Sequence, residues 1–321
     1  SRRETRRGSA MTITICSVSY RHGQVLAWNH RLLCELNRNS RTKYRWLVAN
    51  NDAADPLDNL RDLPNLTIVP GSDERALGPS NHHAVALNQL LRMADTRFVL
   101  VLDPDFYLLV PEWLDRIPDH LQRRGLQFFG APWHPRYTPN YRYFPAVHCM
   151  WIDTAKVPTG ELDFRPILDD QLRLPLGLGD HGRLQRSWDT GTRVYRRFGR
   201  AKDVRSECAL QVFRPERDPT VKPAIVSARN RMVEALLPDA MCYMPKRRAS
   251  FTRIGFAERG WIPMALPPLW EETVWNDRPF GLHVRRSFGA AKRDSAAELD
   301  LLRTVLDSLT AAVSGAAVAA G

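Results

Sequence analysis

Short apolar runs and helical spacings alternate along the first hundred residues of the chain. Runs rich in β-branched and other apolar residues predict buried strands over residues 11–20, 44–49, 66–69 and 97–102. Between these runs, apolar residues three and four positions apart predict helices over residues 24–37 and 80–93, the second with Ser80 as its N-cap. Strands that alternate with helices in this way favour an α/β fold with a mostly parallel, Rossmann-like sheet flanked by helices.

The pattern is weaker in the second half of the chain. It predicts strands over residues 127–130 and 146–152, a helix near 190–198 and a closing amphipathic helix over 294–312. The proline-rich stretch over residues 214–279 predicts irregular structure. We therefore expect one composite domain, with its regular sheet in the first half.

Composition excludes several classes of protein. The chain has 321 residues, of which 44% are hydrophobic and 25% charged, so it is not a mainly disordered protein. Five cysteines without CxxC spacing argue against a disulfide scaffold, and the sequence shows neither an apolar run of membrane-spanning length nor an apolar leader. We expect a cytoplasmic protein, with residues 1–10, which hold four arginines, as a disordered tail or cloning remnant.

The net charge of +11 favours anionic partners such as phosphates, nucleotides, nucleic acid or an anionic lipid surface. A nucleic-acid-binding protein, the alternative from a different functional class, needs basic residues interleaved with aromatic residues on one surface. The basic clusters at 245–248 and 285–286 are short and scattered. We therefore expect no nucleic-acid partner and at most peripheral contact with a membrane.

The tripeptide Asp103-Pro104-Asp105 directly follows the strand predicted over residues 97–102. Ligands of α/β sheets bind beyond the carboxyl ends of the strands, where these two carboxylates are expected. Mg²⁺ and Mn²⁺ prefer oxygen ligands and often share their coordination shell with substrate phosphates. The motif therefore predicts a Mn²⁺ or Mg²⁺ site; the alternative is a turn whose aspartate caps a helix over residues 110–116.

Several segments together resemble glycosyltransferases of the GT-A fold and of the family 2 type. They are TITICSVSY, NND after the second strand, SNHHAVALNQLL before RFVLVLDPD, and a later W-D-T-G, and they span about residues 11–199. The resemblance implies a nucleotide-sugar-dependent transferase of the hexosyltransferase type (EC 2.4). It also implies a nucleotide-sugar-binding half over residues 11–126, an irregular acceptor-binding and catalytic half over 127–293, and a C-terminal helix and tail over 294–321.

The resemblance assigns roles around the DXD motif. It implies that Asp105 is the strongest metal ligand and that Asp103 contacts the metal or the ribose. A late histidine completes the metal site in many such enzymes, and His283 is the histidine in this position. The alternative for His283 is an ordinary packed side chain.

The nucleotide site is expected at the ends of the first two strands and along the following helix. Its candidate residues are Ser17, Ser19 and Tyr20 after the first strand, Asn51 and Asp52 after the second, and Asn81 and Asn88 on one helix face. The family commonly places an acidic residue that contacts the base after the second strand. Here Asn51 and Asp52 take that place, so the identity of the base stays open, and for the helix an ordinary capped helix is the alternative.

The resemblance places the catalytic base at Asp189, within Ser187-Trp188-Asp189-Thr190-Gly191. A carboxylate there would remove the proton of the acceptor hydroxyl. Alternatively, Asp189 is the N-cap of the following helix. The remaining candidates for the base are Asp169, Asp170 and Asp180, and the aromatic candidates for the acceptor cleft are Trp133, His134, Tyr137 and Trp188.

The function expected from these features is inverting transfer of a sugar from a nucleotide-diphosphate sugar to a carbohydrate, lipid-linked or natural-product hydroxyl. A sugar nucleotidyltransferase is the nearest alternative. It would favour a glycine-rich phosphate loop after the first strand, and residues 19–23 contain a single glycine. The neighbours His148 and Cys149 lie on a predicted strand and would point to opposite faces, which argues against a nucleophilic cysteine–histidine pair.

Overall fold

The computed structural model describes residues 11–55, 57–72, 78–135, 143–166, 190–199, 201–214, 251–284 and 296–318. Its larger sheet has seven strands. In spatial order they are β3 (Leu66–Pro70), β2 (Lys43–Asn50), β1 (Thr12–Ser19), β4 (Phe98–Leu102), β7 (Pro145–Asp153), β6 (Phe128–Pro132) and β8 (Ser206–Cys208). β3, β2, β1 and β4 run parallel, whereas β7 is antiparallel to both of its neighbours. The predicted α/β class with a mostly parallel central sheet is confirmed.

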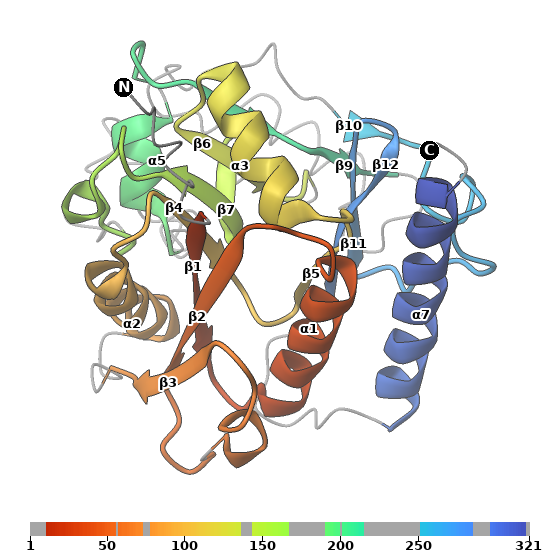
Figure 1. Cartoon of the computed structure of the whole chain (residues 1–321), viewed down its shortest axis with the longest axis horizontal. Coiled ribbons are helices and arrows are strands. Elements are labelled where there is room, and N and C mark those ends of the chain that lie inside the picture. Colours follow the sequence, from red (N-terminus) through yellow and green to blue (C-terminus); the bar gives the residue numbers. More distant parts are fainter. Residues whose placement is uncertain are drawn as a thin grey trace, which may run out of the picture.

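Helices cover both faces of this sheet because its strands alternate their side chains between two cores. In β4, Leu100 packs with α1 (Gly23–Leu36) and α3 (Trp113–Arg124), whereas Val101 packs with α2 (Pro79–Met93) and α5 (Thr192–Phe198). Figure 1 shows α1 and α2 on opposite sides of β1 and β2. Both faces are buried, which explains why these strands are continuous apolar runs in the sequence.

A second sheet of five strands lies beside the first (Figure 1). Its spatial order is β10 (Phe251–Thr252), β9 (Leu210–Val212), β11 (Trp270–Trp275), β12 (Arg278–Val284) and β5 (Phe106–Leu108). The C-terminal helix α7 (Ala296–Val318) packs with this sheet and with the outer face of α1. The prediction of irregular structure over residues 214–279 is therefore wrong for β10 and β11. β10 has only two residues and pairs with the distant β9, and the hairpin of β11 with β12 is obscured by the prolines of this stretch.

Two helix starts differ from the predictions. α2 begins at Pro79 with Gly78 as its N-cap, so Ser80 lies in the first turn and is not the cap. α5 begins at Thr192 with Gly191 as its N-cap, so the alternative assignment of Asp189 as the cap of this helix is wrong. Short 3₁₀ helices occupy Asp58–Leu60 and Thr159–Glu161. None of the helices in the described part of the chain is both long and apolar enough to cross a bilayer.

Candidate metal and nucleotide site

The Asp103-Pro104-Asp105 turn is the connection between the two sheets. β4 of the larger sheet ends at Leu102 and β5 of the smaller sheet begins at Phe106. The buried amide of Asn29, on α1, donates to the carbonyl oxygens of Pro104 (3.2 Å) and Phe106 (2.8 Å), one on each side of Asp105. The backbone of the turn is thus fixed by a third element.

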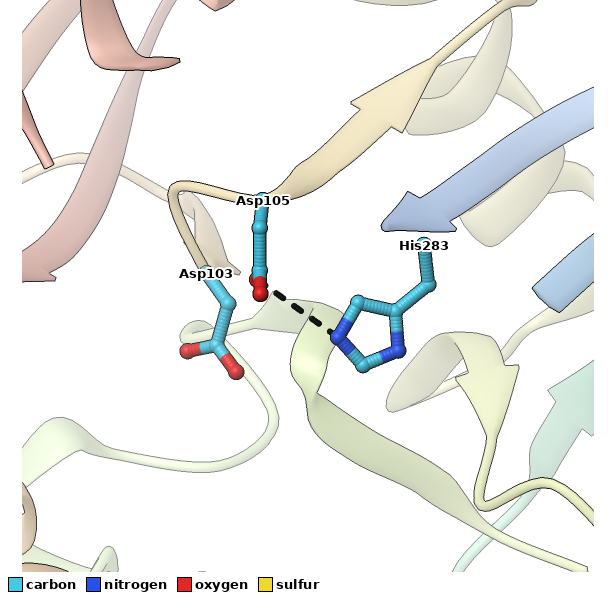
Figure 2. Close-up of side chains that lie close together, drawn as sticks. All are labelled: Asp103, Asp105 and His283. Atoms are coloured by element: carbon cyan, nitrogen blue, oxygen red, sulfur yellow. Dashed lines mark ion pairs between the residues drawn. The ribbon is translucent and has the colours of Figure 1, made fainter. Parts of the chain in front are cut away.

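His283 reaches this turn from β12. β12 pairs with β5, with His283 opposite Phe106, and the backbone N–H of Val284 donates to the carbonyl of Asp105 at 2.9 Å. The imidazole Nε2 lies 3.5 Å from Asp105 Oδ1 (Figure 2). Two chain segments separated by almost 180 positions therefore meet at one point, through strand pairing that the sequence does not display.

We call Asp103, Asp105 and His283 the Asp105 cluster. Each of these residues offers one ligand atom, and the three atoms lie within 4.8 Å of one another. In the described part of the chain no other group of three His, Cys, Asp or Glu side chains meets this criterion. The carboxylates of Asp103 and Asp105 keep 23% and 19% of their side-chain surface exposed, whereas His283 keeps 7%. The cluster therefore has a buried imidazole side and an open carboxylate side.

The ionisation of the cluster is set by its own members. Burial alone would raise the pKa of Asp105, but the charge and hydrogen bond of His283 outweigh burial and lower this pKa to about 2. Burial likewise opposes the charged form of His283, yet the carboxylates of Asp105 and Glu271 raise its pKa to about 10. Both carboxylate and imidazole are charged at neutral pH.

The donor set fits a hard divalent cation. Its two carboxylates are the oxygen ligands that Mn²⁺ and Mg²⁺ prefer, and its imidazole belongs to the commonest type of metal-binding side chain. Two ligand atoms on one ion at about 2.1 Å are at most about 4.2 Å apart, so small side-chain movements bring the three atoms to bonding distance. Two carboxylates facing one imidazolium also leave an excess of negative charge at the open side.

Three nearby residues were missed by the sequence analysis as contributors to this site. His83 Nε2 lies 3.6 Å from Asp103 Oδ1, and His148 stacks on the His283 ring with centroids 4.7 Å apart. Glu271, on β11, contacts the far nitrogen of His283 at 2.9 Å. His83 could have been found because it belongs to the SNHHAVALNQLL segment of the family resemblance. No feature of the sequence pointed to Glu271 or His148 as part of this site.

Among the predicted nucleotide contacts, the residues of the first strand differ in placement. Ser17 is buried, donates to the Leu102 carbonyl at 2.6 Å and accepts from Trp46 Nε1 at 2.9 Å, so its hydroxyl holds the end of β4. Ser19 is buried at the end of β1 and accepts from the backbone N–H of His22, whereas Tyr20 is exposed.

Asn51 and Asp52 lie directly after β2, the strand next to β1. The amide of Asn51 donates to the His82 carbonyl and accepts from the backbone N–H of Ser72. Asp52 is buried and accepts from Arg21 at 2.5 Å. The loops after β1 and β2 are therefore connected to each other and to the start of α2.

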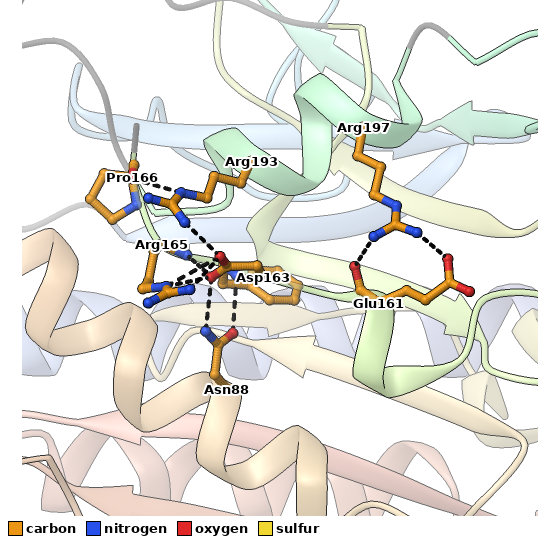
Figure 3. A network of polar contacts seen from close by, with 8 residues as sticks. Asn88, Glu161, Asp163, Arg165, Pro166, Arg193 and Arg197 are labelled. Atoms are coloured by element: carbon orange, nitrogen blue, oxygen red, sulfur yellow. Dashed lines mark hydrogen bonds and ion pairs between the residues drawn. The ribbon is translucent and has the colours of Figure 1, made fainter. Parts of the chain in front are cut away.

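Asn81 and Asn88 are both on α2, and Asn81 is buried. The Asn88 amide donates to Asp163 at 3.1 Å and accepts from the backbone N–H of Phe164 at 3.0 Å (Figure 3). The structure thus does not bring the Asn88 side chain to the Asp105 cluster, and its contact with a nucleotide stays a prediction.

The predicted base Asp189 and its rivals Asp169, Asp170 and Asp180 lie outside the described residues, as do Tyr137 and Trp188. Thr190, which follows Asp189 in the chain, is described: its hydroxyl donates to the Ser80 carbonyl at 3.0 Å and lies 3.4 Å from His83 Nδ1.

Trp133 and His134 are buried, and His134 Nε2 donates to the Val212 carbonyl. Burial raises the pKa of the Cys149 thiol, in keeping with the absence of a nucleophilic role for this residue.

No family model and no curated protein matches this sequence. Solved glycosyltransferase structures are similar to part of it. TarS from S. aureus is 16% identical over 48% of this chain and 50% of its own, with a TM-score of 0.33. The mannosyltransferase PcManGT from Pyrobaculum calidifontis, in complex with GDP-Man and Mn²⁺, is 16% identical over 47% and 48%, with a TM-score of 0.36. The galactosyltransferase LgtC, with donor and acceptor sugar analogs, is 17% identical over 46% and 59%, with a TM-score of 0.30.

The chain thus spans about half the length of the glycosyltransferase structures that it matches. Overlap at these TM-scores is confined to part of the fold.

Proposed function

We propose that this protein is an inverting glycosyltransferase that moves a sugar from a nucleotide-diphosphate sugar to an acceptor hydroxyl. The observation that carries the proposal is the convergence of Asp103, Asp105 and His283 at the carboxyl end of β4. This is the edge of the sheet at which α/β proteins bind nucleotides, and the cluster presents two carboxylates on its open side. Asp103 and Asp105 form its DXD motif.

A divalent cation, Mn²⁺ or Mg²⁺, would be held by Asp103, Asp105 and His283. When bound, such an ion supplies charge that stabilises a departing nucleoside diphosphate. The turn supports this role because Asn29 fixes the backbone on both sides of Asp105. The turn is therefore held on α1, and the bond from the Val284 N–H to the Asp105 carbonyl holds it on β12.

The nucleoside would bind over the ends of β1 and β2. Ser19 ends β1 and Asn51 and Asp52 follow β2, and the two strands are parallel neighbours with Ser19 opposite Asn50. The exposed ring of Tyr20 and the start of α2 with Asn81 border the same edge. We therefore assign the base and ribose to this edge, with residues 11–126 as the donor half of the protein.

Asp189 would act as the base that removes the proton of the acceptor hydroxyl. Its support is the placement of its chain neighbour Thr190, which contacts His83, itself 3.6 Å from Asp103. Direct attack of that hydroxyl on the sugar carbon, opposite the departing diphosphate, would invert the configuration. The acceptor half would be formed by residues 127–293.

The decisive experiment measures thermal stability of the full chain with a panel of nucleoside diphosphates, each with and without Mn²⁺. A ligand at about 100 times its Kd stabilises the folded state by about 2.7 kcal/mol, so binding raises the Tm. We expect a Mn²⁺-dependent shift with one nucleotide, absent in Asp105→Ala and in the nearly isosteric Asp105→Asn. A shift of equal size in these variants would contradict the assignment of the site.

Turnover separates the proposed reaction from nucleotidyl transfer. With the nucleotide chosen by the thermal shift and with alcohols and glycosides offered as acceptors, we expect release of nucleoside diphosphate from its sugar conjugates. The glycoside product, which does not undergo mutarotation, should show inverted anomeric configuration by NMR. Consumption of a nucleoside triphosphate together with a sugar 1-phosphate would instead identify a nucleotidyltransferase.

A further inference from the structure

We propose that Glu271 is a positioning residue that holds His283 with Nε2 directed at Asp103 and Asp105. The inference rests on the proposed function, because it assigns His283 to a cation. Glu271 lies directly opposite His283 in the antiparallel pair β11–β12, and its Oε2 is 2.9 Å from His283 Nδ1. The two nitrogens of one ring thus face carboxylates of different elements.

The cross-strand pairing explains why the contact is specific. Side chains directly opposite each other in an antiparallel pair have Cβ atoms about 4.5–5.5 Å apart and lie on the same face of the sheet. A cation at this site takes the place of the Nε2 proton of the charged ring. The proton on Nδ1, donated to Glu271, then leaves Nε2 as the only nitrogen with a lone pair for the cation. Glu271 therefore selects the ring nitrogen and the orientation that the site needs.

The remaining contacts of the ring restrict its tilt. His148 stacks on it at an interplanar angle of 19°, and Phe106 lies 5.9 Å from it at 46°. These contacts restrain the plane of the ring, but a flip by half a turn would preserve them while placing Cδ2 against Glu271 and Cε1 against Asp105 in place of the two nitrogens. The hydrogen bond to Glu271 is what distinguishes the two ring orientations.

Burial of Glu271 points to a role beyond packing. Its side chain is 1% exposed, and a buried carboxylate costs several kcal/mol of solvation that an apolar residue would not. Glu271 is also not a member of the Asp105 cluster, whose ligand atoms lie within 4.8 Å of one another. A carboxylate that contacts a candidate ligand from behind typically changes metal affinity about 10- to 100-fold when removed.

The test is a titration of the full chain with Mn²⁺ alone. The EPR signal of free Mn²⁺ measures the Kd, and the ¹⁴N coupling of bound Mn²⁺ reports whether a ring nitrogen is a ligand. In Glu271→Gln we expect the Kd for Mn²⁺ to rise about 10-fold or more and the ¹⁴N coupling to weaken. His283→Ala should abolish the coupling. Glu272→Gln is the matched control: it alters the next residue of β11, whose carboxylate accepts from the backbone N–H of Phe256 and faces away from His283.

The outcomes separate the two claims. Wild-type protein that binds no Mn²⁺ would overturn the metal assignment of the proposed function and, with it, the role of Glu271. Wild-type binding with an unchanged Kd and ¹⁴N coupling in Glu271→Gln would overturn the role of Glu271 alone. If Glu271→Gln does not fold, Glu271→Asp, which keeps the charge but shortens its reach, must show the same weakening for the inference to stand.

Discussion

Two carboxylate clusters of this molecule have opposite balances of charge. In the Asp105 cluster, two carboxylates face one imidazole (Figure 2). In the second, Asp163 accepts from the guanidinium groups of Arg165 and Arg193 at 2.9 Å and from the amide of Asn88 (Figure 3). We call Asn88, Asp163, Arg165 and Arg193 the Asp163 cluster. One cluster has an excess of negative charge, and the other an excess of positive charge.

The pKa of the central carboxylate is low in both clusters, so ionisation does not distinguish them. Burial opposes ionisation of Asp163, and the hydrogen bonds from Arg165, Asn88 and Arg193 reverse its effect and lower the pKa well below the usual range. What differs is the cationic side chain that contacts the carboxylate. A guanidinium keeps its proton at all accessible pH values, whereas an imidazole can bind a metal through the same nitrogen that contacts the carboxylate. The partner of the carboxylate, rather than its pKa, therefore distinguishes the Asp163 cluster from the proposed metal site.

The largest effect is expected from Asp105→Asn, measured as the affinity for Mn²⁺. Loss of a direct ligand should raise the Kd by more than about 100-fold, beyond the range typical of residues that only contact a ligand. Asp163→Asn, the same chemical change in the other cluster, should leave the Kd within about twofold. Equal Mn²⁺ affinity in both variants would remove the distinction between the clusters.

Asp163→Asn should instead lower the free energy of unfolding. Hydrogen bonds to charged groups contribute about 1.5–3 kcal/mol when buried, and the partial exposure of Arg165 and Asp163 favours the lower end, about 2 kcal/mol for the variant. Urea unfolding at pH 7 measures the change. A loss below about 0.5 kcal/mol would mean that the cluster adds no more than an ordinary surface ion pair.

The contribution of Asp163 should also depend on pH. Because its folded-state pKa lies below the unfolded value, the stabilisation is complete above the unfolded pKa and is lost as the pH falls through the folded one. The difference in unfolding free energy between wild type and Asp163→Asn should be constant from pH 7 to about pH 5 and shrink below about pH 4. A difference that persists unchanged at pH 3 would assign the effect to packing.

The smallest effect is expected from Asn88→Ala. It removes a hydrogen bond to Asp163 and leaves the Phe164 N–H without its amide acceptor, which should cost about 1 kcal/mol in urea unfolding. The nucleotide-induced change in Tm of the same variant tests the contact predicted from the sequence. A reduced change would support that contact, and an unchanged one would limit Asn88 to the Asp163 cluster.

The sequence predicted the larger sheet well except for the short strand β8, and it predicted the central strands best because they are buried on both faces. β1, β2 and β4 are apolar runs bounded by polar residues, and they were located to within about two residues at each end. The smaller sheet was not predicted. β5 has three residues and pairs with the distant β12, whereas β11 and β12 form a hairpin whose pattern is obscured by the prolines within and beside it.

The candidate site could be predicted only where a residue type carries its own chemistry. Asp103 and Asp105 were identifiable from their position after β4, and His283 from the family resemblance; the structure brings the three together. Asn29 and Glu271 were not identifiable. The role of Asn29 follows from a helix crossing a turn, and that of Glu271 from its register opposite His283 in the β11–β12 hairpin, which was not predicted.

Asn29 holds the backbone of the Asp103-Pro104-Asp105 turn through two hydrogen bonds, and further backbone hydrogen bonds limit how readily this turn opens to solvent. The N–H of Asp103 donates to the carbonyl of His148 on β7, and the N–H of Val284 on β12 donates to the carbonyl of Asp105. Within the turn, the N–H of Phe106 donates to the carbonyl of Asp103. Exposing the Asp103 and Val284 amides to solvent deuterium requires the turn to separate from β7 and from β12. They should therefore exchange in the slowest group of the molecule, and the arrangement of Asp103 and Asp105 should persist until the protein unfolds as a whole.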